Sequence, residues 1–446
     1  MLKKNYNLLD ENIFVIFKKF VITSTSGMIM ISLYILFDTI FIGQGIGQAG
    51  LAALNISIPI YNILFGTGIL IGSGSATIMA ISLGNKDMKG AQRAYEHSVC
   101  LGIITGIVYT FSGLMFIDQI AIFLGASTEN MQLVKEYLGI IVSFSWSFVM
   151  VYNLAAVVRN DNGPKRAMLA MGIGGITNVI FDYILIFPLE MGMKGAAIAT
   201  VMSSLVSLVI LVWHFIGKHS SLKIKSMKLQ QKLAGKILTI GMSSFIIEVS
   251  SGIVIFLFNK ELLKTLGDIG VSAYSIIANV ALMVTAIFSG IAQGVQPIAS
   301  MNFGARKLDR VYKVRRYGII SAIALGVIFM LIGLIFPKAI IAAFTGEGGK
   351  IVDITEEGIK VYFLAFPIIG VNIVVTGFFQ SIGQARYAMV FSLLRGIIFA
   401  AVGLKILSNM FGTIGIWLTI PVIETLTLVI ITGTFLINKT RWNFYS

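Results

Sequence analysis

TIFIGQGIGQAGLAALNISIPIYNILFGTGILIGSGSATIMAISLGN, residues 39–85, contains no charged side chain. Comparable uncharged runs cover residues 195–217 and 361–385. The chain of 446 residues is 57% hydrophobic and only 12% charged, whereas soluble domains are about 25% charged. This is more apolar surface than one water-facing globule can bury. The composition therefore predicts an all-α protein that crosses the lipid bilayer many times.

The composition offers little to a cofactor. A single cysteine, Cys100, allows neither an intrachain disulfide nor a cysteine-based metal site. The Gly-rich stretch Gly72–Ala76 lacks the lysine of a nucleotide-binding loop. We therefore expect no cofactor, no ATP as the energy source, and no metal other than a possible bound Na⁺.

The apolar runs predict twelve spanning helices. Each is about 20 residues or longer, the length that a bilayer requires, and none shows the sustained period-two alternation of a barrel strand. The predicted spans are residues 20–43, 51–83, 95–117, 136–158, 167–188, 194–216, 237–258, 270–301, 317–337, 361–384, 387–407 and 412–437.

The basic residues predict the orientation of these spans. Most of the 34 Lys and Arg residues fall at the two termini and in every second loop, where Arg159 and the lysines of residues 218–236 are counted. Only Arg395 is left inside a span. By the positive-inside rule both termini are cytoplasmic, in an inner (plasma) membrane. The net charge of +14 is thus explained by orientation, and we expect no nucleic-acid partner.

The chain repeats itself at an offset of 220 residues. GQAGLAA at residues 47–53 aligns with GDIGVSA at residues 267–273, and SLGNK at residues 82–86 with NFGAR at residues 302–306. Two copies of six spans enter the membrane from the same side, so their symmetry axis runs along the membrane normal. We expect a six-helix lobe at 1–217, a basic linker at 218–236 and a second lobe at 237–446, arranged for alternating access.

Four acids fall inside predicted spans: Asp38, Asp182, Glu248 and Glu424. An ionisable residue there costs about 2.5–3.5 kcal/mol even on lenient insertion scales. Each acid therefore needs a partner, a water-filled cavity or a function.

The two aspartates of the first lobe each have a polar neighbour one helical turn earlier. Tyr34 precedes Asp38, and Asn178 precedes Asp182, so each pair shares a helix face. We expect these faces to converge on one oxygen-rich pocket. The alternative, that the aspartates only pair with hydrogen-bond donors inside the membrane, stays open.

The sixth span adds Thr200 and Ser203 to this predicted pocket. Such a set of oxygens suits either a shared proton or a Na⁺ ion that has lost most of its water. In the second copy the aspartates are replaced by Phe258 and Gly403. A residue needed to fold the repeat would tend to recur, which favours a role in ion coupling.

The second lobe offers accessory candidates for coupling or substrate binding. Glu248 and Glu424 both can face a central cavity, with Arg395 as a salt-bridge partner for one of them. Gln293 and Gln296 carry amides one turn apart before a proline. These residues can serve function or only helix packing.

Five stretches together resemble the multidrug and toxic compound extrusion (MATE) family. They are FDTIFIG at residues 37–43, RNDNGPKRAM at 159–168, NVIFD at 178–182, GAAIAT at 195–200 and QGVQPIASMNFG at 293–304. The resemblance covers nearly the whole chain. It implies a transporter of two six-helix lobes, not an enzyme.

The resemblance also implies a mechanism and a partner. A cationic, amphipathic drug leaves as H⁺ or Na⁺ enters, and the family's cation site maps onto Asp38, Asn178, Asp182 and Thr200. We expect a monomer. The alternative is a flippase of a lipid-linked oligosaccharide or other amphiphilic lipid precursor, which needs a more basic cavity than this chain offers.

Overall fold

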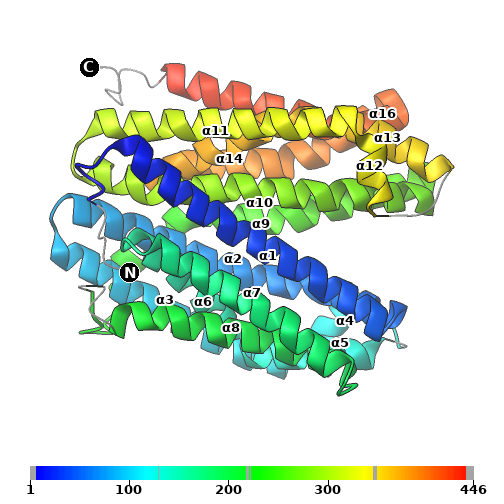
Figure 1. Ribbon diagram of the computed structural model, residues 1–446, viewed down its shortest axis with the longest axis horizontal. Helices are drawn as coiled ribbons and strands as arrows, with labels where there is room; N and C mark the ends of the chain where they lie inside the picture. Colours follow the sequence, from blue (N-terminus) through cyan, green and yellow to red (C-terminus); the bar gives the residue numbers. More distant parts are fainter. Residues whose placement is uncertain (1–6, 129, 217–219, 221, 345–348, 438–446) are drawn as a thin grey trace.

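The computed structural model describes residues 7–128, 130–216, 220, 222–344 and 349–437, and these residues form helices without any strand (Figure 1). The helices are α1 (Ile13–Gly45), α2 (Gln48–Gly84), α3 (Met88–Met115), α4 (Ile117–Phe123), α5 (Met131–Ser143), α6 (Ser145–Asn160), α7 (Pro164–Ile186), α8 (Gly192–Ile216), α9 (Gln231–Leu266), α10 (Asp268–Gly304), α11 (Leu308–Ile335), α12 (Pro337–Ala342), α13 (Lys350–Tyr362), α14 (Phe366–Ser381), α15 (Ala385–Leu393) and α16 (Phe399–Ile437). A 3₁₀ turn, η1 (Phe363–Ala365), joins α13 to α14, and a π-helical turn, η2 (Leu394–Ile398), joins α15 to α16.

The described helices supply the twelve predicted spans. Ten continuous helical stretches are long and apolar enough to cross a membrane, and α5 and α6 form one more span that bends by 54°. The longest stretch, Ala385–Ile437, is interrupted at Gly412, whose φ of 59° and ψ of −134° are not helical. Two spans therefore meet at this glycine, because only Gly adopts such a conformation without strain. The prediction of an all-α, twelve-span membrane protein is confirmed.

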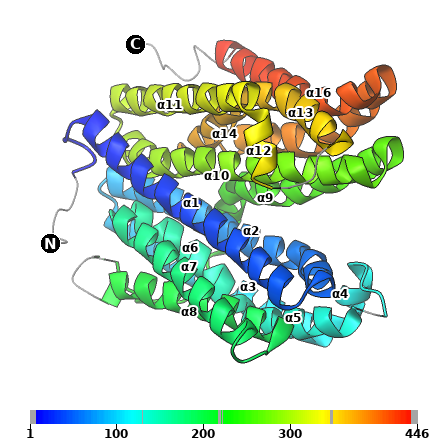
Figure 2. The same cartoon turned by 45° about the vertical axis from the view of Figure 1, so that its right-hand side comes forward.

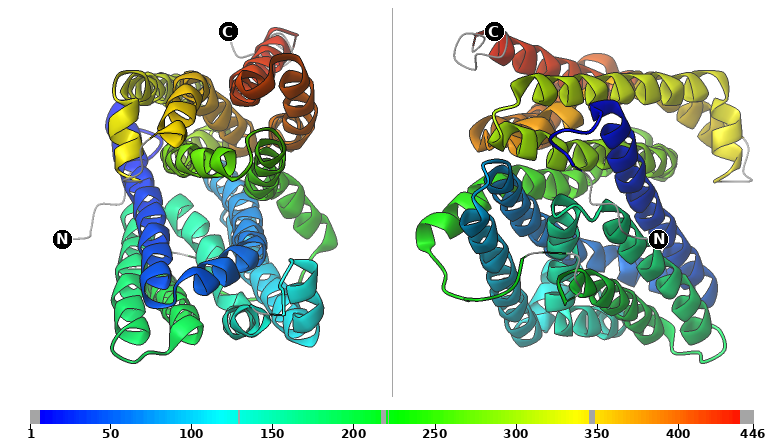
Figure 3. Two further views of the ribbon diagram at one scale, coloured as in Figure 1. Left: turned by 90° about the vertical axis from the view of Figure 1, so that its right-hand side faces the viewer. Right: turned by 60° about the vertical axis from the view of Figure 1, so that its left-hand side comes forward.

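The spans form two bundles that lie against each other. Helices α2 to α8 fill one bundle and α10 to α16 the other, while α1 runs diagonally across both (Figures 1 and 2). The chain enters at α1 and leaves at α16 on the same end of the assembly, as the views in Figure 3 also show. We refer to this end as the termini face.

The two hydrophobic cores exchange segments near the termini face. The first core contains residues 31–215 of the first half but also Ile237 and Ile240 of α9. The second core contains residues 258–423 but also Ile16 and Phe20 of α1. Each half thus lends the beginning of its first helix to the other half. A division of the chain at residues 218–236, as the sequence analysis expects, does not follow the packing there.

The segments that precede α1 and α9 are fastened across the interface in the same reciprocal way. Before α1, Arg310 donates hydrogen bonds to the carbonyl oxygens of Leu8 and Glu11 at 3.1 and 2.8 Å. Before α9, Glu96 accepts from the backbone N–H groups of Lys225 and Ser226 at 3.0 and 3.1 Å. We call residues 8–11 and 222–230 the two straps. Residues 217–219 and 221 of the predicted linker lie outside the described residues.

Glycines bring the two halves into backbone contact at the termini face. A side chain at Gly84 would collide with the carbonyl oxygen of Met301, and one at Gly304 with that of Ile81. Both glycines and both carbonyls are related by the offset of 220 residues. The interface is therefore closed at this end, and any larger side chain would force the helices apart.

Candidate functional site

Asp38 and Asp182 meet inside the first half. Asp38 lies on α1 with 8% of its surface exposed, and Asp182 lies on α7 with none. Their carboxyl groups are within hydrogen-bonding reach of each other. No basic side chain among the described residues forms an ion pair with either of them.

Further oxygens surround this carboxyl pair. Asn178 is fully buried one turn before Asp182, and neither its amide oxygen nor its amide nitrogen has a hydrogen-bond partner in the described part of the chain. Thr200 of α8 is 6% exposed and donates to the carbonyl of Ala196 at 3.0 Å. Tyr137 of α5, which the sequence analysis did not single out, lies beside Thr200 and near both carboxyls.

The pocket of Asp38, Asp182 and Asn178 has polar atoms with nothing to satisfy them. Both carboxyl oxygens of Asp182 and one of Asp38 are buried without a donor in the described residues. Unpaired buried polar groups are costly. Protons or a small cation would satisfy them: a proton shared between the carboxyls, or a Na⁺ bound by the carboxylates with amide and hydroxyl oxygens. No group of three or more acid, His or Cys side chains suited to a larger metal ion occurs among these residues.

Three tyrosines connect the surroundings of this pair to the centre of the molecule. The Tyr61 hydroxyl lies 2.9 Å from that of Tyr34 and 3.1 Å from that of Tyr152. Tyr34 is one turn from Asp38 on α1, and Tyr152 of α6 lines the central pocket. Tyr34, an accessory candidate from the sequence, therefore hydrogen-bonds within this cluster. Tyr61 and Tyr152 were missed, because tyrosines are ordinary in apolar helices.

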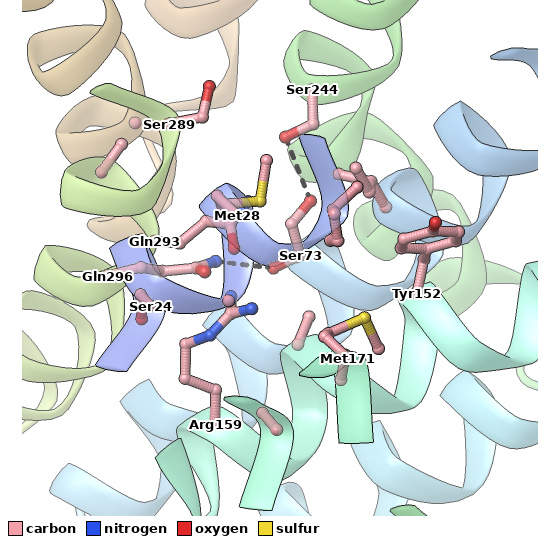
Figure 4. A pocket seen from close by; sticks show the side chains of 18 of the residues that line it. Ser24, Met28, Ser73, Tyr152, Arg159, Met171, Ser244, Ser289, Gln293 and Gln296 are labelled. Atoms are coloured by element: carbon pink, nitrogen blue, oxygen red, sulfur yellow. Dashed lines mark hydrogen bonds between the residues drawn. The ribbon is translucent and has the colours of Figure 1, made fainter. Parts of the chain in front are cut away.

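A central pocket lies between the halves, lined by α1, α2, α6, α7, α9, α10 and α14 (Figure 4). Several lining residues are related by the offset of 220 residues: Ser24 and Ser244, Met28 and Glu248, and Ser73 and Gln293. The pocket therefore lies on the internal symmetry axis. Glu248 breaks this symmetry, since an apolar methionine occupies its counterpart position.

Hydrogen bonds between the halves close the pocket towards the termini face. Gln380 of α14 donates to the hydroxyls of Ser73 and Ser244 at 2.9 and 2.8 Å, and Gln296 of α10 donates to the hydroxyl of Thr77 at 3.0 Å. Ser73 and Thr77 belong to α2 of the first half, so these bonds join the two halves. Gln296 was a candidate from the sequence, whereas Gln380 was missed.

The second half buries a different polar cluster. Arg395 donates two hydrogen bonds to one carboxylate oxygen of Glu424 at 3.0 and 2.7 Å, and Asn372 donates to the other oxygen at 2.6 Å. The side chains of Arg395 and Glu424 are 12% and 5% exposed. Of the two glutamates offered to Arg395 by the sequence, Glu424 is the partner. Glu424 does not line the central pocket, and Glu248 does.

The remaining candidates and one omission complete the picture. Gln293 lines the pocket, with its amide 3.5 Å from the sulfur of Met28. Ser203 is 8% exposed, and its hydroxyl forms no hydrogen bond to another described residue. Arg159, counted in the sequence only as a charge of the cytoplasmic side, points into the pocket between Gln296 and Met171 (Figure 4). Its place in the last turn of α6, at the edge of an apolar run, is the only sequence signal.

Comparison with known proteins identifies the family. The MatE family model matches residues 24–184 and 240–404, one block in each half. The chain belongs to the MatE family. Members of this family are membrane transporters, not enzymes, so the protein is a membrane transporter.

MatE relatives of known sequence and structure match almost the whole chain. The multidrug export protein MepA of Staphylococcus aureus strain MRSA252 is 27% identical over 411 residues, which cover 90% of this chain and 88% of MepA. MepA of Staphylococcus saprophyticus is 24% identical over 402 residues, with the same coverage. A solved MATE family transporter of the MOP superfamily, described as outward-facing, superposes with a TM-score of 0.92 at 22% identity over 99% of this chain and 98% of its own. This last likeness establishes the two-lobed fold.

Proposed function

We propose that this MatE transporter is a secondary antiporter that exports amphipathic cationic compounds in exchange for H⁺ or Na⁺. The observation that carries the proposal is the buried pair of Asp38 and Asp182, which meets without a basic partner among the described residues. The export of multidrug substrates named for the MepA relatives is consistent with it. A carboxyl pair of this kind is a cation-binding device whose occupancy changes its net charge.

In the proposed cycle, ion and substrate compete for different arrangements of the first half. H⁺ or Na⁺ bound at Asp38, Asp182, Asn178 and Thr200 stabilises one arrangement, and the substrate in the central pocket requires the other. Entry of the ion then expels the substrate. One elementary charge that falls through 100 mV releases about 2.3 kcal/mol, which supports a roughly fiftyfold substrate gradient.

The closed termini face is, in this proposal, the cytoplasmic one. The lysine-rich strap and the loops of that face carry most of the positive charge, which the positive-inside rule assigns to the cytoplasm of the plasma membrane. The central cavity measures about 110 Å³, less than the roughly 300 Å³ of the smallest drug-sized sites. The halves must therefore part further to admit a substrate. A single chain contains both halves, so the proposed unit is a monomer.

A flippase of an anionic lipid precursor fits the pocket less well. A pyrophosphate group calls for several basic side chains, since bidentate Arg contacts are its usual ligands. The central pocket offers one, Arg159, together with the acid Glu248. The second intramembrane arginine, Arg395, is already bound to Glu424.

The proposal is tested in proteoliposomes with separately imposed gradients. Purified protein is reconstituted with an entrapped cationic dye, and efflux is recorded under a pH gradient alone, a Na⁺ gradient alone, and neither. We expect one gradient to drive efflux in the wild type and neither to do so in Asp38→Asn. Asp309→Asn, which changes an exposed acid on the termini face, is the matched control. Gradient-driven efflux that persists in Asp38→Asn would overturn the coupling role.

A further inference from the structure

Two opposite charges in the central pocket have no partner within the protein. Arg159 reaches the pocket from α6 of the first half, and Glu248 from α9 of the second. Neither side chain forms an ion pair or a hydrogen bond to another described residue. The only hydrogen bond at Glu248 is accepted by its backbone carbonyl, from Ser251 at 2.7 Å.

Charges nearby are neutralised, which sets these two apart. Arg166, one loop further along, lies 3.0 Å from His214, which in turn lies 2.9 Å from Asp161. Arg395 is held by Glu424 at 2.7 Å. A charge taken out of water without a partner is strongly unfavourable. The chain therefore pairs its structural charges and leaves only one base and one acid for a visitor to the pocket.

The walls between the two charges are apolar and soft. Phe65 and Tyr152 meet edge to face with ring centroids 4.2 Å apart, and Met28 and Met171 add flexible thioether side chains. Methionine re-packs readily and contacts aromatic rings favourably. Such walls suit a flat aromatic body more than a flexible acyl chain.

We propose that the preferred substrates are zwitterionic aromatic amphiphiles, with an amine that meets Glu248 and a carboxylate that meets Arg159. This inference rests on the proposed role of the central pocket in export, and it narrows the cationic class suggested by the sequence. The ligand supplies both missing counter-charges at once. Because the two charges come from opposite halves, a substrate of this kind also bridges the halves.

The test compares two probes that differ in one charge. A fluorescent aryl-piperazine carboxylic acid carries both charges, and its methyl ester keeps only the amine. Binding of each is titrated to full-length protein in detergent, with no gradient present, for the wild type, Arg159→Gln and Glu248→Gln. Arg316→Gln and Glu357→Gln, distant from the pocket, are the matched controls.

We expect a charge-dependent pattern. Arg159→Gln weakens the acid by about tenfold to a hundredfold, the range of one charge-assisted hydrogen bond, and leaves the ester unchanged. Glu248→Gln weakens both probes, because both carry the amine. Equal losses for acid and ester in Arg159→Gln would overturn the inference.

Two further arms separate the inference from neighbouring explanations. Lysophosphatidylethanolamine, a zwitterion without an aromatic body, should compete weakly, and competition as strong as that of the acid would overturn the aromatic class. The acid should also be transported under the driving gradient. Charge-dependent binding without gradient-driven transport would sink the proposed antiport and leave the pocket assignment standing.

Discussion

The two halves of this transporter bury polar clusters that differ in one respect. In the second half, Glu424 is held by Arg395 and Asn372, so its charge is neutralised where it stands. In the first half, Asp38 and Asp182 face each other with no base beside them. Both clusters occupy six-helix repeats of one ancestry in sequence. The difference teaches that the first cluster is completed by something that comes and goes, and the second by the protein itself.

The largest expected effect follows from removal of the unpaired acids. Asp182→Asn leaves the shape of the carboxyl nearly unchanged but prevents it from binding an ion. Under a membrane potential of 100 mV we expect the substrate gradient to fall from roughly fiftyfold to none. The measurement is dye accumulation in proteoliposomes. A gradient that survives in this variant would erase the contrast between the halves.

The paired cluster should respond in stability. Arg395→Met leaves Glu424 buried without its partner, and breaking a buried ion pair costs about 3–5 kcal/mol. The check is thermal unfolding of purified protein in detergent. Replacing both residues, as Arg395→Met with Glu424→Met, should recover much of the loss because no charge is then left unpaired. If the double variant were as unstable as the single one, the ion pair would not be the cause.

The tyrosine cluster should have an intermediate effect. Tyr61→Phe removes the hydroxyl that joins Tyr34 to Tyr152, a change of about 0.5–1.5 kcal/mol per hydrogen bond. We expect a roughly twofold to tenfold drop in gradient-driven transport, with the folded protein retained. Tyr183→Phe, on the exposed side of α7, is the control. An unchanged transport rate in Tyr61→Phe would show that the cluster does not link the carboxyl pair to the pocket.

The straps should show the smallest effect and the least difference between the halves. Glu96→Ala and Arg310→Ala each remove hydrogen bonds that fasten one strap to the opposite half. Each should raise local opening by about 1 kcal/mol, seen as roughly fivefold faster amide exchange in that strap. Hydrogen exchange with mass spectrometry resolves the two segments. Strongly unequal responses would contradict the reciprocal arrangement.

The sequence predicts the spans well because the length and charge of an apolar run are local properties. The break at Gly412 and the bend between α5 and α6 fall at the limits of what such runs reveal. The meeting of Asp38 with Asp182 was predictable from the cost of an acid in a membrane, since each then needs company. That argument works for charges only.

Contacts between distant neutral groups could not be predicted in this way. Gln380 joins Ser73 and Ser244 across the interface, and nothing in its local sequence distinguishes it from other amides. Arg159 was assigned to a basic loop because it borders one. Its orientation into the pocket depends on how α6 packs against its neighbours, which is a property of the folded chain.

The central claim is that the unpaired acids of the first half exchange an ion for the substrate. Its most direct test is ion release on substrate binding, in detergent and without a gradient, followed with a pH indicator in weakly buffered solution and with radioactive Na⁺ in parallel. The account predicts that substrate releases H⁺ or Na⁺ from the wild type and from Glu424→Gln, and releases neither from Asp182→Asn. Release that is unchanged in Asp182→Asn would contradict it.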